Sequence, residues 1–92
     1  MENEWVIYTK NNCINCILVK ELLYVEDVKY IHCDNFINTE YNKLHFLQSM
    51  KNKIGYCYNT FPMVFHKDKF IGGYNDCKEY YKNITFTIDD DF

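Results

Sequence analysis

Two cysteines separated by two residues, Cys13 and Cys16, constrain this chain more than any other feature of its sequence. They follow Trp5-Val-Ile-Tyr-Thr9, a β-branched and aromatic run that predicts a short buried strand. From there the apolar residues recur at helical spacing, at Ile14, Ile17, Leu18, Leu22 and Val25. Asn12 is the expected N-cap of this helix. The cysteine pair is therefore predicted where a strand leads into the first turn of a helix.

The position of Cys13 indicates redox chemistry. A sulfur in the first turn of a helix faces unpaired backbone N–H groups and the positive end of the helix dipole, and both stabilise a thiolate. Lys10, three residues earlier, adds a positive charge. The pKa of such a thiol can fall well below the value of ~8.5 for a free cysteine. We therefore expect Cys13 to attack disulfides as the nucleophile and Cys16 to resolve the mixed disulfide.

Two other interpretations of the pair remain open. A structural zinc site needs two further ligands, usually a second close pair. Cys33, Cys57 and Cys77 stand alone, and the three histidines form no closely spaced pair. The two cysteines of the pair could also be merely buried. A cysteine pair that follows a strand in a β-α-β pattern favours the redox role over both alternatives.

The composition excludes several classes of partner. The chain has 92 residues, enough for one domain, with a net charge of −3 and a pI near 5.5. An acidic chain of this kind offers no basic surface for nucleic acid or for anionic lipid. We find no signal-peptide pattern and no apolar run of the ~18 residues that a membrane helix needs. Five cysteines, an odd number, fit a reducing compartment, and we expect a cytoplasmic protein.

Further elements follow along the chain, and no linker divides it. We expect a strand at 29–34, a helix at 39–53, a hairpin of strands 60–66 and 69–72 joined at Lys67-Asp68, and a helix at 75–83. The predicted order is β-α-β-α-β-β-α. We expect one domain over residues 1–83 and an extended acidic tail over 84–92.

Residues 5 to about 83 resemble the glutaredoxin family. Four elements occur in the family's order: Tyr8-Thr-Lys10 with Cys13-Ile-Asn-Cys16, then Thr60-Phe61-Pro62, a hairpin ending in Gly72-Gly73, and Asn75-Asp76. The resemblance implies an α/β thioredoxin-like fold with a four-stranded mixed sheet and helices on both faces. It also implies a glutathione-dependent thiol–disulfide oxidoreductase that acts on protein disulfides and glutathione mixed disulfides.

The resemblance further implies where glutathione binds. A cis bond before Pro62 would turn the backbone of Phe61 toward Cys13, where it can pair with the cysteine of glutathione. The γ-glutamyl end would meet the start of the last helix, at Gly73, Asn75 and Asp76. Lys10 would serve both the thiolate and the glycine carboxylate.

Departures from the family pattern keep other functions open. The family usually has Pro-Tyr between its cysteines, where this chain has Ile14-Asn15, and often a basic residue where this chain has Asn59. One alternative is a glutaredoxin that binds an iron–sulfur cluster and has no reductase activity. A second is a thioredoxin-type reductant, although the family motif Trp-Cys-Gly-Pro-Cys is absent. A third is an adaptor that acts only through its tail.

The last seven residues, Phe86-Thr-Ile-Asp-Asp-Asp-Phe92, resemble a second family. The small subunit of ribonucleotide reductase ends in a similar peptide, typically Phe-Thr-Leu-Asp-Ala-Asp-Phe, which docks into the large subunit. The resemblance implies the large subunit as a partner, contacted by Phe86, Ile88 and Phe92. The alternative is an acidic segment that only keeps the protein soluble.

Overall fold

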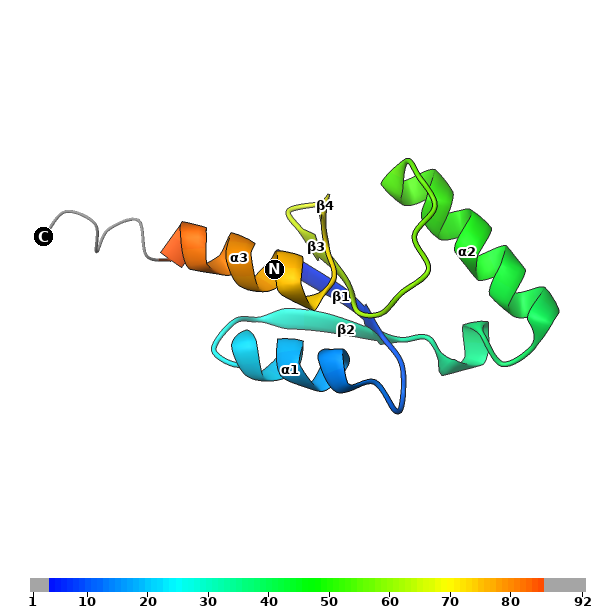
Figure 1. Ribbon diagram of the computed structural model, residues 1–92, viewed down its shortest axis with the longest axis horizontal. Coiled ribbons are helices and arrows are strands. Elements are labelled where there is room, and N and C mark those ends of the chain that lie inside the picture. Colours follow the sequence, from blue (N-terminus) through cyan, green and yellow to red (C-terminus); the bar gives the residue numbers. More distant parts are fainter. Residues whose placement is uncertain (1–3, 86–92) are drawn as a thin grey trace, which may run out of the picture.

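Four strands form one mixed sheet in the computed structural model, which describes residues 4–85 of the chain (Figure 1). Across the sheet the order is β2 (Val28–His32), β1 (Trp5–Thr9), β3 (Met63–His66) and β4 (Lys69–Gly72). β1 pairs in parallel with β2, whereas the β1–β3 and β3–β4 pairs are antiparallel. This is the four-stranded mixed sheet of the thioredoxin-like fold that the sequence predicts.

Helices cover both faces of the sheet, as expected. α1 (Ile14–Leu22) and α3 (Tyr74–Thr85) pack on one face, and α2 (Glu40–Ile54) lies over the other (Figure 1). A 3₁₀ turn, η1 (Asp34–Phe36), leads from β2 toward α2. In the part of the chain that the structure describes, no helix is long and apolar enough to cross a membrane.

The face under α1 and α3 holds a tightly packed core. Its buried members come from both strands and helices: Trp5, Ile7, Val19, Leu23, Val64 and Cys77. Because side chains alternate across a strand, these strand residues share one face of the sheet while their neighbours point to the other.

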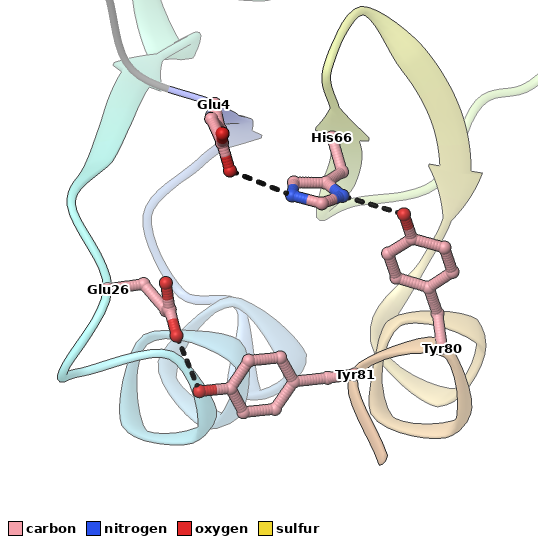
Figure 2. A network of polar contacts seen from close by, with 5 residues as sticks. All are labelled: Glu4, Glu26, His66, Tyr80 and Tyr81. Carbon is pink, nitrogen blue, oxygen red and sulfur yellow. Dashed lines mark hydrogen bonds and ion pairs between the residues drawn. The ribbon is translucent and has the colours of Figure 1, made fainter. Parts of the chain in front are cut away.

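Polar contacts close the edge of this core (Figure 2). His66 at the end of β3 lies with its Nδ1 2.6 Å from the Tyr80 hydroxyl and its Nε2 3.4 Å from a carboxylate oxygen of Glu4. On α3 the next residue, Tyr81, donates its hydroxyl hydrogen to Glu26 at 2.8 Å. The two tyrosines thereby connect α3 to the sheet and to the segment after α1.

The face under α2 is filled by larger and less buried side chains. Met50, Met63 and Phe65 are buried there, surrounded by partly buried aromatic residues. A hollow of about 490 Å³ remains beside Tyr8 and Phe46. This face of the sheet is therefore less completely packed than the face under α1 and α3.

Local sequence signals explain several element boundaries. Thr39 caps α2 by accepting the N–H of Asn42 at 3.1 Å, and Gly55 ends that helix with a φ of 103°. Lys67 and Asp68 have φ values of 53° and 66°, which are typical of the two-residue turn that joins twisted hairpin strands. The predicted hairpin is confirmed.

Other boundaries differ from the prediction. The second strand ends at His32, because Cys33 already leads into η1, and the third begins only at Met63, after the Phe61-Pro62 bond. The last helix continues through Thr85, so the first two residues of the expected extended tail are helical. Residues 86–92 lie outside the described residues.

The apolar stripe predicted for the first helix matches its buried face only in part, because Leu22 packs against the core and Leu18 is half-buried but the other three residues are exposed. Ile14, Ile17 and Val25 are 71%, 54% and 66% exposed. The buried side chains are instead those of Cys16 and Val19, continued by Leu23 just after the helix. These three positions also recur at helical spacing, and packing against β1 and α3 selects them.

Candidate active site

Cys13 and Cys16 are joined in a disulfide at the start of α1. Their Cα atoms are 5.2 Å apart, within the range that a disulfide requires. Cys13 is half-buried, whereas Cys16 is only 3% exposed. An incoming thiol or disulfide can therefore reach Cys13 but not Cys16.

Cys13, and not Asn12, is the N-cap of α1. Its Sγ accepts a hydrogen bond from the backbone N–H of Cys16 at 3.2 Å, and its carbonyl accepts the N–H of Ile17 at 3.2 Å. Asn12 was the wrong prediction because it has a φ of 55° and lies one residue outside the helix. Because Cys13 is the cap, its sulfur lies at the unpaired N–H groups of the first turn of α1. These N–H groups favour a negative charge on the sulfur.

The loop before β3 packs directly against the cysteine pair. The Phe61-Pro62 peptide bond is cis, and the Phe61 carbonyl oxygen lies 3.7 Å from Cys13 Sγ. The ammonium of Lys10 lies 5.8 Å from the centre of the Phe61 ring. Phe61 thus lies near both Cys13 and Lys10, although it is far from them in the sequence.

The two adjacent glycines allow the start of α3 to lie against this loop. Gly72 has a φ of 130°, and a Cβ there would come within 2.8 Å of Cβ of Asp76. A Cβ on Gly73 would lie 2.9 Å from the Tyr58 hydroxyl and 3.8 Å from the carbonyl oxygen of Pro62. Only glycine at these two positions fits without displacing its neighbours.

Asp76 turns back over the start of its own helix. Its Oδ2 accepts the backbone N–H of Gly73 at 3.4 Å, in the manner of a residue that completes a helix cap. Asn75 and Asp76 are both exposed in the first turn of α3. The sequence therefore located these two residues correctly in the first turn of a helix.

Lys43 is a residue of this site that sequence reasoning missed. A hollow of about 390 Å³ beside the site is lined by residues from four segments: Lys10, Asn15, Ile37, Lys43, Leu47, Asn59, Thr60 and Phe61. Lys43 reaches it from α2, so a positive charge is present although Asn59 occupies the position that is often basic in the family. No local pattern could have revealed this, because only the tertiary fold brings α2 to Lys10.

The remaining cysteines differ from the pair. Cys33 and Cys77 are fully buried, and burial raises the pKa of Cys33 to about 11 and that of Cys77 to about 12. Cys57 is exposed. Within residues 4–85, no three histidine, cysteine or acidic side chains gather as a metal site would require.

A disulfide of the C-x-x-C type at a helix start, on a thioredoxin-like sheet, defines a dithiol thiol–disulfide oxidoreductase. The family model for glutaredoxin matches residues 5–71, well over half of the chain. The chain belongs to the glutaredoxin family. A sequence comparison with curated proteins gives no match.

Solved glutaredoxin structures share the fold. Glutaredoxin 1 from Francisella tularensis, crystallised with cacodylate, has 24% identity and a TM-score of 0.71, over 87% of this chain and 93% of that one. A wheat glutaredoxin has 26% identity and a TM-score of 0.67, over 86% and 71% of the two chains. A buckwheat glutaredoxin–glutathione complex has 24% identity and a TM-score of 0.67, over 88% and 70%.

Proposed function

We propose that this glutaredoxin uses glutathione to reduce protein disulfides and glutathione mixed disulfides in the cytoplasm. The observation that supports it best is that two segments meet at one sulfur and a third lies beside them. Cys13 Sγ caps α1, touches the Phe61 carbonyl before the cis-proline, and has the start of α3 next to that same loop. A tripeptide lying along this path would place its thiol at the nucleophile. Its two charged ends would then lie near Lys10 and near the start of α3.

In the proposed reaction, the Cys13 thiolate attacks one sulfur of a substrate disulfide. A mixed disulfide forms, and the second substrate sulfur leaves as a thiolate that takes up a proton. Cys16 then attacks Cys13 Sγ, which closes the Cys13–Cys16 disulfide and releases the reduced substrate. One glutathione thiolate opens this disulfide at Cys13, and a second attacks the glutathionyl sulfur, giving oxidised glutathione and the Cys13 thiolate.

The residues around the sulfur suggest how glutathione is held. The backbone of Phe61 would pair with its cysteine, and Asp76 would bind its ammonium through the carboxylate oxygen that Gly73 does not use. Lys10 and Lys43 would share the glycine carboxylate, since both line the same hollow. Asn75 and the first N–H groups of α3 would face the α-carboxylate.

The test of this function is the reduction of a small glutathione mixed disulfide, with glutathione and glutathione reductase supplied. We expect turnover in the native protein and in Cys57→Ser, and none in Cys13→Ser. If glutathione gives no turnover while the protein reduced with dithiothreitol still reduces insulin, recycling is of the thioredoxin type. A coloured dimer after anaerobic purification, without either activity, would indicate cluster binding instead.

The role of Lys43 has its own test. An exposed charge pair contributes at most ~1 kcal/mol, so we expect Lys43→Gln to raise the KM for glutathione about two- to fivefold with little change in kcat. Lys51→Gln is the matched control, because Lys51 lies on α2 but does not line the hollow. Equal effects of the two substitutions would remove Lys43 from the site.

We also propose that Phe86, Ile88 and Phe92 dock this protein on the large subunit of ribonucleotide reductase. These residues lie outside the described part of the chain, and the seven-residue resemblance alone supports the proposal. Docking would raise the concentration of the reductant near an enzyme that needs a dithiol. A peptide of residues 84–92 should bind the large subunit and displace the small-subunit peptide. Equal binding by the Phe92→Ala peptide, or no binding at all, would refute docking.

A further inference from the structure

The exposed face of α1 next to the disulfide is apolar. Ile14 follows Cys13 directly, and the N–H of Ile17 bonds to the Cys13 carbonyl, so both isoleucines belong to the first turns of the helix. They are 71% and 54% exposed. Residues three apart on a helix are neighbours on its surface, so the two side chains form one patch at the reactive sulfur.

This patch has no role in the described fold. The side chains of α1 that enter the core are those of Val19 and Leu22, and neither isoleucine belongs to either core cluster among residues 4–85. Neither lines the hollow that contains Lys10 and Lys43. The basic hollow and the apolar patch are therefore separate surfaces that both adjoin Cys13.

Disulfide exchange requires the substrate to touch this part of the surface. The new S–S bond is only about 2.05 Å long, so the polypeptide on either side of the substrate sulfur must lie against the residues around Cys13. Cys16 is buried and cannot be approached first. A substrate side chain next to the attacked cysteine will therefore lie close to the surfaces that adjoin Cys13, which include the basic hollow and the two isoleucines.

We propose that Ile14 and Ile17 form the docking surface for polypeptide substrates and select disulfides whose neighbouring residues are apolar. The proposal deepens the reductase function and rests on it, but it does not depend on recycling by glutathione. The occupant is a peptide segment that carries a disulfide and places an apolar side chain over the patch. One methylene group in a hydrophobic pocket changes kcat/KM by about tenfold or more, and a leucine brings several such groups to the patch.

The experiment uses two synthetic peptides that each contain one intramolecular disulfide. They differ only at the residue beside the first cysteine, which is leucine in one and serine in the other. The full-length protein is reduced with dithiothreitol, freed of it, and mixed with each peptide in single-turnover reactions. We expect the leucine peptide to react about tenfold faster.

The variant Ile14→Ser/Ile17→Ser should reduce this preference to about twofold or less, whereas Ile14→Val should retain most of it. Because the readout is a ratio within one protein, partial loss of folding does not imitate the effect. Val25→Ser is the matched control: Val25 is β-branched and 66% exposed, but lies beyond the far end of α1. It should leave the ratio and both rates unchanged.

Two results would overturn the proposal. Equal rates for the two peptides with the native protein would exclude selection of apolar neighbours. A preference that persists in Ile14→Ser/Ile17→Ser would place the selecting surface elsewhere. Failure of glutathione recycling would leave these single-turnover ratios intact, so the docking proposal and the glutathione proposal fail separately.

Discussion

The start of α1 and the interior of the sheet domain both contain cysteines. The first environment favours ionisation of the thiol, and the second opposes it. At the start of α1, Cys13 is half-buried and its Sγ accepts a backbone N–H. In the interior, Cys33 and Cys77 are fully buried, and burial raises the pKa of both thiols, to about 11 and about 12. The Cys33 thiol donates to the Ile31 carbonyl at 3.5 Å, a contact that only the protonated sulfur can make.

The difference shows that position relative to backbone N–H groups, and not residue type, decides which cysteine reacts. Desolvation disfavours a thiolate, while a helix N-terminus replaces the lost water with aligned N–H groups. Cys33 and Cys77 therefore behave as small apolar residues, and Cys13 is the sulfur that meets disulfides. Four predictions test this contrast.

The largest expected effect is that of Cys13→Ser. A hydroxyl at this position does not ionise at neutral pH, so turnover of both protein disulfides and glutathione mixed disulfides should fall by several orders of magnitude. Cys77→Ala should retain turnover in any fraction of the protein that folds. Activity surviving in Cys13→Ser would mean that another cysteine is the nucleophile.

The second largest effect should be a difference in alkylation rate between Cys13 and the two buried cysteines. With a pKa of about 11, only about one thousandth of the Cys33 thiol is ionised at pH 8, and Cys77 is ionised still less. In the reduced, folded protein, iodoacetamide should label Cys13 first and these two last, by mass spectrometry of the peptides. Labelling of Cys33 should rise with pH up to about 11. Labelling at pH 8 as fast as that of exposed Cys57 would contradict this.

A smaller effect is expected for Cys16→Ser. Without the resolving thiol, reduction of protein disulfides should fall on the order of tenfold or more, while reduction of glutathione mixed disulfides continues through Cys13 alone. Insulin reduction and the mixed-disulfide assay, run on the same preparation, measure the two rates. Full dithiol activity in Cys16→Ser would assign the resolving step to another thiol.

The smallest effect concerns stability. Cys77 is completely buried in the core under α1 and α3, so Cys77→Ser places a hydroxyl there and should lower the free energy of unfolding by about 1–3 kcal/mol. Cys57→Ser, at an exposed site, should change it by no more than about 0.5 kcal/mol. Urea unfolding under reducing conditions measures both. Equal values would mean that the Cys77 site accommodates a polar group.

Elements that depend on neighbouring residues were predictable. The strand before the cysteine pair, the helix capped by Thr39 and the hairpin at Lys67-Asp68 all follow from local patterns, and the structure confirms them. The C-x-x-C disulfide at a helix start was predictable for the same reason. The roles assigned to Lys10, Phe61 and Asp76 remain proposals, although the fold brings their segments to one place.

Elements that depend on packing were not predictable. Two helical stripes coexist on α1, one through Ile14 and Ile17 and one through Cys16, Val19 and Leu23. Hydrophobicity cannot choose between them, because both recur with the period of a helix. The N-cap was misplaced by one residue, because Asn is a preferred N-cap residue and Cys is not, whereas the backbone conformation places Cys13 at the cap.

The sequence by itself determined the α/β order, the position of the redox pair and the family, because these rest on residues close together in the chain. Only the tertiary structure decided which face of α1 is buried, that Lys43 joins Lys10 at one hollow, and that Cys33 and Cys77 are sealed inside. The reason is physical. Burial and long-range contacts depend on which surfaces remain once the strands and helices have packed together, and the spacing of apolar residues along the sequence does not contain that information.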